Sequence, residues 1–331
     1  MTLTDKAFDV VCLRPEMDFL KVGVQPPKEL SIIYISPDDK NLPVLVKQAR
    51  AIVLPAVGPK LKGDLFEGSS VQLVQVTGAG VDRVDEAIMK KLGIAVANVA
   101  GGSNSALAEY VLGCALVLHR QIVWADREIR SGNYVDFRKK MIANNLRGLV
   151  GLTVGIIGLG NIGLAVARAF RNIGCELVYF DPAVPLSKNA DEIDARSVTL
   201  NELLNVSDVV SIHVPLLPET EGLIGAVELG QMKSDAVLIN ASRGGVVDES
   251  ALAMSLTKAQ LGAAAVDVYS DEPPSDTNPL FSLEGEAAQR VLFTPHIAGV
   301  TRQAWAYLFE TAWDNVVRVL SRGETAINRV Y

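Results

Sequence analysis

The stretch TVGIIGLGNIGLAVARAF (residues 153–170) joins an apolar run typical of a buried strand to an amphipathic run typical of a helix. Gly158, Gly160 and Gly163 stand at the junction in the spacing GxGxxG. In this context the spacing is typical of a dinucleotide site. The first glycine permits a tight turn, the second lets a pyrophosphate approach the backbone, and the third lets helix and strand pack closely. The helix N-terminus then offers N–H groups to the phosphates. The alternative is a strand–helix turn that binds no ligand.

Asp181 supports the dinucleotide interpretation. It ends the next apolar run, VYFD, about 20 residues after the last glycine, where a carboxylate at a strand's carboxyl end accepts hydrogen bonds from a ribose. An aspartate that only forms a turn before Pro182 is the alternative. The stretch from Pro182 to Pro185 carries no cation for a 2′-phosphate, so the sequence predicts NAD rather than NADP.

Apolar runs alternate with helix-like stretches on both sides of this motif, the pattern of parallel sheets covered by helices. A first series of strands is predicted at 8–13, 31–36, 51–55, 71–76 and 94–99. A second series is predicted at 153–158, 176–180, 208–214, 236–241, 264–268 and 291–295. A long buried helix is predicted from Ser103 to His119, and an amphipathic helix from Arg302 to Leu320. The length of 331 residues favours two such α/β domains.

Three polar residues follow strands of the second series, at the edge where open α/β sheets hold their ligands. Arg243 lies in INASRGG, Glu272 follows VDVYSD, and His296 follows VLFTP. Each residue alone has a structural explanation: Arg243 as a surface cation, Glu272 as a loop acid and His296 as a core histidine. Together their chemistry is coherent. An imidazole moves a proton near neutral pH, a neighbouring carboxylate fixes its tautomer, and a guanidinium holds a carboxylate in its planar fork. These residues predict a nicotinamide-dependent oxidoreductase.

The sequence resembles the NAD-dependent D-isomer-specific 2-hydroxyacid dehydrogenase family over nearly its whole length. The matching stretches are LVGLTVGIIGLGNIG (149–163), SDVVSIHVPLLPET (207–220), MKSDAVLINASRGGVVDE (232–249), AAAVDVYSDEP (263–273) and FTPHIAGVT (293–301). The resemblance implies two doubly wound parallel-sheet domains. A Rossmann coenzyme domain, residues 104–300, is inserted into a flavodoxin-like substrate domain, residues 1–103 and 301–331, with the active site in the cleft. It also implies a homodimer joined through the NAD-binding domains.

The resemblance also implies roles for individual residues. His296 is the general acid/base paired with Glu272, and Arg243 binds the substrate's carboxylate and carbonyl. Ala79 and Gly80, in TGAGVD (77–82), bind the same carboxylate through backbone N–H groups. Besides the three glycines and Asp181, the residues expected to contact NAD are Asn161, Ile162, Val214, Ala241 and Asp267, the last on the nicotinamide amide.

The expected reaction interconverts a small D-2-hydroxy acid and its 2-oxo acid, for example by glyoxylate or hydroxypyruvate reduction. Glu272 argues against the formate dehydrogenase branch, which has glutamine there. Phosphite oxidation stays open, because the same three residues can serve it. Phosphoglycerate is disfavoured, because VLPAVGP (53–59) has no basic residue and the chain does not continue past 331 into a regulatory domain. A non-enzymatic NAD-sensing corepressor is the alternative from another class, and the short stretch after Leu320 argues against it.

Composition restricts partners and location. The net charge of −7 argues against nucleic acid and against an electrostatic membrane anchor. No apolar run reaches the ~18–20 residues of a membrane span, and the N-terminus lacks a signal-peptide pattern. Cys12, Cys114 and Cys175 lie far apart, which favours a reducing, cytoplasmic compartment, and no metal site is expected. His119 is interpreted as structural, and His213 as structural or cofactor-side.

Overall fold

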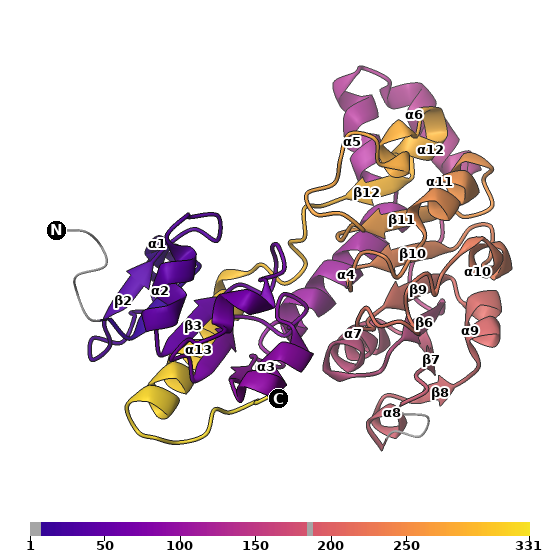
Figure 1. Cartoon of the computed structure of the whole chain (residues 1–331). Coiled ribbons are helices and arrows are strands. Elements are labelled where there is room, and N and C mark those ends of the chain that lie inside the picture. Colours follow the sequence, from indigo (N-terminus) through magenta and orange to yellow (C-terminus); the bar gives the residue numbers. More distant parts are fainter. Residues whose placement is uncertain (1–7, 184–187) are drawn as a thin grey trace. The chain divides into compact units, whose positions relative to one another are not determined.

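The computed structural model describes residues 8–183 and 188–331, and the chain divides into two compact units (Figure 1). The first unit contains the residues up to Ser103 together with Val300–Tyr331, and the second contains Asn104–Gly299. Each unit has its own parallel sheet with helices, so the predicted α/β class is confirmed. The N-terminal stretch in which no signal-peptide pattern was found starts at residues 1–7, which lie outside the described residues. In the stretch from Pro182 to Pro185, from which NAD rather than NADP is predicted, the residues after Ala183 also lie outside them.

The first unit contains a five-stranded sheet in the order β2-β1-β3-β4-β5, with every neighbouring pair parallel. The strands are β1 (Val10–Cys12), β2 (Ile32–Tyr34), β3 (Ala51–Leu54), β4 (Leu73–Val76) and β5 (Ala95–Ala97). The helices are α1 (Glu16–Lys21), α2 (Leu42–Gln48), η1 (Gly63–Phe66), α3 (Glu86–Leu92) and α13 (Arg302–Leu320). All five strands lie within predicted segments, and α13 has the predicted bounds.

Alternate residues of these strands feed two cores. Val11, Ile52 and Val74 pack on one face with residues of α2 and α3, whereas Val10 and Val53 pack on the other face with residues of α1 and α13. This two-sided burial explains why the strands are continuously apolar. The first sheet is therefore covered on one face by a helix from the far end of the sequence.

The second unit contains a seven-stranded sheet in the order β12-β11-β10-β9-β6-β7-β8, again parallel throughout. Its strands are β6 (Thr153–Ile157), β7 (Glu176–Phe180), β8 (Ala195–Ser197), β9 (Val209–Ile212), β10 (Val237–Asn240), β11 (Ala263–Val266) and β12 (Val291–Phe293). Its helices are α4 (Asn104–His119), α5 (Ile122–Arg130), α6 (Tyr134–Ala143), α7 (Asn161–Asn172), α8 (Lys188–Glu192), α9 (Leu200–Val206), α10 (Ala226–Gln231), α11 (Glu249–Thr257), η2 (Pro279–Ser282) and α12 (Gly285–Gln289).

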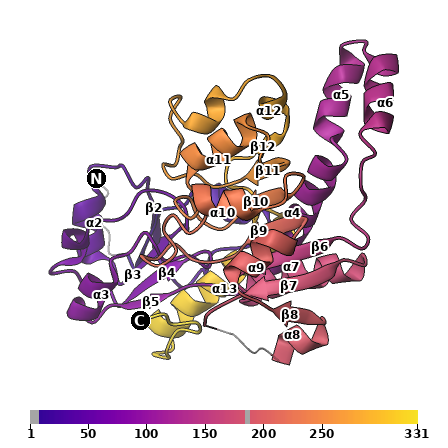
Figure 2. The ribbon, with the colours of Figure 1, turned by 90° about the vertical axis from the view of Figure 1, so that its right-hand side faces the viewer.

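Helices cover both faces of the second sheet as well (Figure 2). Residues of α4 and α7 share one core with the strands, and residues of α9, α10 and α11 share the other. The sequence did not predict β8, α5 or α6. The helices α5 and α6 lie side by side, with the rings of Trp124 and Phe137 5.3 Å apart.

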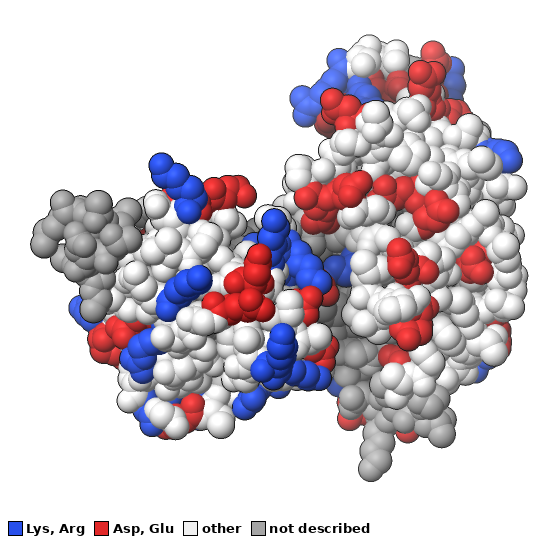
Figure 3. Space-filling model, viewed as in Figure 1, with Lys and Arg blue, Asp and Glu red and all other residues white. Residues whose placement is uncertain are grey.

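Two surface properties follow from this arrangement. No single helix of the described residues is long and apolar enough to cross a membrane. The pair α4–α5 passes that test by length and composition, but it bends by 54° and part of α4 is buried in the core. Acidic side chains predominate on the visible face of the second unit, in keeping with the net charge of −7 (Figure 3).

Candidate active site

The glycine-rich turn connects β6 to α7. Gly158 has φ +91°, and a Cβ there would lie 2.7 Å from the carbonyl oxygen of His213. A Cβ on Gly163 would overlap the carbonyl oxygen of Gly158, whereas a Cβ on Gly160 would meet nothing within 4 Å. Two glycines are therefore required by the protein's own backbone, and the third has an open face. That open face, at the N-terminus of a 12-residue helix, fits the pyrophosphate of a dinucleotide.

Asp181, directly after β7, is bonded to this turn. Its Oδ2 accepts a hydrogen bond from the N–H of Leu159 at 2.8 Å, and its Oδ1 accepts one from the N–H of Ala183 at 2.9 Å. The bond to Ala183 forms the local turn before Pro182 that was the alternative explanation for Asp181. The bond to Leu159 connects the carboxylate to the glycine-rich turn. Because a carboxylate offers about four acceptor positions, these bonds are compatible with further bonds to a ribose.

The order of the strands lays the predicted residues along one edge of the sheet. Asn161 and Ile162 open α7, and the remaining residues follow the carboxyl ends of neighbouring strands. In the order of the sheet these are Asp181 after β7, Gly158 after β6, Val214 after β9, Ala241 after β10, Asp267 after β11 and His296 after β12. Adjacent parallel strands lie about 4.8 Å apart, so the candidate nucleotide end and the acid–base end occupy opposite parts of one edge.

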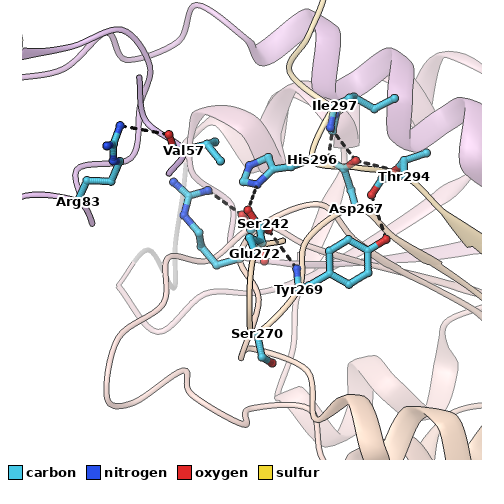
Figure 4. A network of polar contacts seen from close by, with 12 residues as sticks. Val57, Arg83, Ser242, Asp267, Tyr269, Ser270, Glu272, Thr294, His296 and Ile297 are labelled. Atoms are coloured by element: carbon cyan, nitrogen blue, oxygen red, sulfur yellow. Dashed lines mark hydrogen bonds and ion pairs between the residues drawn. The ribbon is translucent and has the colours of Figure 1, made fainter. Parts of the chain in front are cut away.

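His296 and Glu272 form a direct pair (Figure 4). The Nδ1 of His296 lies 2.8 Å from Oε2 of Glu272, and the two side chains are 25% and 26% exposed. The Oε1 of Glu272 accepts a hydrogen bond from the N–H of Tyr269 at 3.1 Å. Burial opposes the charge on Glu272, but the hydrogen bond and charge of His296, the Tyr269 N–H and the charge of Arg243 hold the pKa of that carboxyl below its usual value. The carboxylate is thus ready to orient the imidazole.

Arg243 is placed by a compact turn after β10. The side-chain amide of Asn240 donates to the carbonyl of Arg243 at 3.2 Å, and Nη1 of Arg243 donates to the carbonyl of Ser242 at 2.7 Å. A Cβ on Gly244 would overlap the carbonyl of Tyr269, so this turn packs directly on the backbone that precedes Glu272. The structure therefore brings Arg243, Glu272 and His296 to the same edge.

Asp267 holds the loop that carries His296. Its side chain is fully buried, and Oδ1 accepts hydrogen bonds from the Thr294 hydroxyl at 2.6 Å and the Ile297 N–H at 2.8 Å. Oδ2 accepts from the Ala298 N–H at 2.9 Å. His296 has φ +55°, in the left-handed region, and its own N–H donates to the Asp267 carbonyl at 2.8 Å. The sequence did not predict that Asp267 anchors this loop or that Thr294 takes part. The expected contact of Asp267 with the nicotinamide amide stays a prediction.

The other two histidines lie apart from this pair. Burial lowers the pKa of His213 to about 3, and its Nε2 lies 2.8 Å from the Ser211 hydroxyl, so it is neutral at physiological pH. Burial also lowers the pKa of His119, at the end of α4. Within residues 8–183 and 188–331, no group of three His, Cys, Asp or Glu side chains is arranged to hold a metal ion.

In the first unit, Ala79 and Gly80 lie in the loop after β4. The side-chain amide of Asn98 donates to the Ala79 carbonyl at 2.7 Å and so fixes this loop. The neighbouring loop VLPAVGP (53–59) has no cation of its own. The buried side chain of Arg83 nevertheless donates to carbonyls of this loop, at 2.9 Å to Pro55 and to Pro59. It also donates to the Val57 carbonyl at 3.2 Å (Figure 4). Sequence reasoning did not identify this contact.

Comparisons with known proteins show the family to which the chain belongs. Residues 112–298 match the family model of the D-isomer specific 2-hydroxyacid dehydrogenase, NAD binding domain. A glyoxylate reductase of Korarchaeum cryptofilum is 32% identical over 89% of this chain and 86% of its own length. A D-3-phosphoglycerate dehydrogenase of Archaeoglobus fulgidus is 38% identical over 71% of this chain but 42% of its own length. The chain thus spans about half the length of the phosphoglycerate dehydrogenases that it matches.

A solved structure has a similar fold over most of the chain. The apo-structure of D-lactate dehydrogenase from Escherichia coli has a TM-score of 0.79 and 26% identity. The similarity covers 97% of this chain and 99% of that one.

Proposed function

Because this chain belongs to the D-isomer specific 2-hydroxyacid dehydrogenase family and carries its NAD binding domain, we propose that it interconverts a small D-2-hydroxy acid and its 2-oxo acid with NAD(H). The observation that carries the proposal is the 2.8 Å His296–Glu272 pair at the sheet edge that also carries the glycine-rich turn. Bound NADH supplies a hydride to the carbonyl carbon of the 2-oxo acid. The second unit then binds the coenzyme, and the first contributes to substrate binding.

His296 moves the proton. Its Nδ1 is bonded to Glu272, which leaves Nε2 for the substrate oxygen. In reduction, Nε2 donates a proton to the carbonyl oxygen as the C=O group becomes an alcohol, and in oxidation the neutral Nε2 accepts that proton. Glu272 stabilises the charged imidazolium and fixes the ring orientation.

Arg243 holds the substrate. Its guanidinium offers paired N–H donors to a carboxylate and stabilises negative charge on the reacting oxygen. Backbone N–H groups of Ala79 and Gly80 are proposed as further donors to the carboxylate.

Glyoxylate and hydroxypyruvate are the proposed substrates. The Korarchaeum cryptofilum relative, which aligns over 86% of its length, is named a glyoxylate reductase. The test is NADH oxidation by the purified protein with glyoxylate, hydroxypyruvate, pyruvate and longer 2-oxo acids, and NAD⁺ reduction with phosphite. Turnover of a 2-oxo acid that is lost in His296→Ala supports the proposal. Turnover of phosphite alone, or of no compound, contradicts it.

We also propose a cytoplasmic homodimer formed through the second unit. The helices α5 and α6 expose large apolar side chains, among them Tyr134 at 59%, Val135 at 61% and Ile142 at 62%. Exposed apolar residues gathered on one element are typical of a protein interface. The free buried cysteines are compatible with a reducing compartment. Light scattering should give twice the chain mass, and Val135→Asp should shift it toward the monomer.

A further inference from the structure

Glu249, the first residue of α11, lies outside the predicted site but is bonded to the segment that carries Glu272. Its Oε1 accepts a hydrogen bond from the backbone N–H of Ser270 at 2.7 Å. Its Oε2 accepts one from the side-chain amide of Asn278 at 2.7 Å. One carboxylate thus holds the chain at a point shortly before Glu272 and at another shortly after it.

The backbone at Tyr269 and Ser270 is shared between two carboxylates. The N–H of Tyr269 donates to Glu272, and the next N–H, that of Ser270, donates to Glu249 (Figure 4 shows the first of these). The backbone of Gly244 packs against the same peptide, because a Cβ on Gly244 would overlap the Tyr269 carbonyl. The peptide that orients Glu272 is therefore fixed from two directions, by the Arg243 turn and by Glu249.

We propose that Glu249 is a positioning residue for the acid–base pair, because it fixes the peptide that holds the Glu272 carboxylate against His296. The inference rests on the proposed function of that pair. The other charged and titratable groups near the pair are Arg243, Asp267 and Tyr269. A purely structural role is the competing explanation, since an acid in the first turn also stabilises a helix.

The test compares Glu249→Ala and Glu249→Gln with Glu228→Ala. Glu228 is a matched control, because it is a first-turn acid of α10 that also accepts a backbone hydrogen bond, from Gly225 at 3.0 Å. For Glu249→Ala we expect the turnover rate with the best 2-oxo acid to fall about tenfold, the size of one lost charge-assisted hydrogen bond, with KM for NADH unchanged. The alkaline limb of the pH–rate profile should move to lower pH, since a displaced Glu272 supports the imidazolium less well. Glu249→Gln keeps one acceptor and should lose less, and Glu228→Ala should leave both the turnover rate and the profile unchanged.

A double-mutant cycle with Glu272→Gln separates the two explanations. If Glu249 acts through Glu272, Glu249→Ala adds little to the loss already caused by Glu272→Gln. Fully additive losses, or a lower kcat with an unshifted pH profile, would overturn the proposal.

A second readout does not depend on activity. The chain has only three histidines, so the imidazole resonances of His296 can be assigned by their loss in His296→Ala and followed against pH. We expect His296 to take up its proton at a lower pH in Glu249→Ala and, to a smaller extent, in Glu249→Gln. An unchanged titration in a folded Glu249→Gln protein contradicts the inference even if no substrate is turned over, whereas a shift supports it even if the proposed reaction fails.

Discussion

Replacing Asp267 by asparagine should loosen the loop that carries His296. The carboxylate is fully buried and accepts three hydrogen bonds, two on Oδ1 and one, from Ala298, on Oδ2. An asparagine oxygen can keep the two bonds on Oδ1, but its NH₂ group then faces the N–H of Ala298. The Ala298 N–H and the new NH₂ group are then two buried donor groups without an acceptor, at about 1–3 kcal/mol each, and the loss of charge assistance costs about 1 kcal/mol for each remaining bond. Relief from burying a charge offsets several kcal/mol of this total, so we expect a net loss of roughly 2–4 kcal/mol in the free energy of unfolding.

Activity should fall with stability in this variant. His296 has φ +55°, and such a conformation costs of order 1–3 kcal/mol and persists only where its surroundings impose it. With a weaker anchor, the imidazole spends less time against Glu272, and kcat drops. Urea unfolding and steady-state kinetics measure the two effects. Asp208→Asn is the control, because Asp208 is a buried carboxylate that precedes β9, at the edge where the strands begin, and bonds Arg147 and Lys233. It should lose stability but keep kcat. The reasoning would be refuted if Asp267→Asn had a free energy of unfolding within about 1 kcal/mol of the parent protein's and an unchanged kcat.

Four further outcomes follow from the site. His296→Ala should lower kcat by ~10²–10⁴-fold while NADH binding, followed by fluorescence, stays near normal; near-normal turnover would remove His296 as the proton carrier. Arg243→Lys keeps the charge but not the paired N–H donors, so KM for the 2-oxo acid should rise and kcat should fall. If both constants stay unchanged, Arg243 does not bind the substrate. NADH should be preferred over NADPH by on the order of a hundredfold in kcat/KM, and Asp181→Ala should narrow that gap; equal use by the parent protein contradicts this assignment. The pKa of Glu272 lies below its ordinary value of 4.5, so the stability it contributes is present above that pH and is lost as the pH falls further. Glu272→Gln should therefore flatten the acid side of the curve of urea midpoint against pH.

The periodicity of apolar residues was sufficient to predict most of the fold. Strands buried on both faces are continuous apolar runs, and the predicted bounds of β7 match those observed. The amphipathic pattern of 302–320 likewise predicted the observed bounds of α13. The edge strand β8 was missed because its three residues, Ala195–Ser197, are partly or fully exposed and carry no such run. The hairpin of α5 and α6 was missed for a related reason, since its apolar residues are divided between a small core around Trp124 and the surface.

The site shows a similar division. Motifs at strand ends predicted which residues share an edge, because parallel strands end together. Three contacts depend instead on tertiary packing. Asp267 bonds the loop of His296, Glu249 bonds Ser270, and Arg83 bonds the carbonyls around Val57. No spacing in the sequence indicates which buried carbonyl or N–H group a charged side chain will contact, so these three contacts are seen only in the folded structure.

The helix α13 has a consequence for how the protein is made. It supplies Phe309, Ala312 and Val316 to one core of the first sheet, and its buried Asn315 bonds Gln75 of β4 at 3.0 Å. The ribosome releases the five strands of that sheet first and this helix only after the whole second unit. At about 5–20 residues per second the delay is roughly 10–40 s, during which this face of the nascent sheet has the cover of α1 but not that of α13. The second unit can complete its fold while the first waits, so the first unit finishes folding last, although its strands are made first, and is the part of the nascent chain most in need of a chaperone.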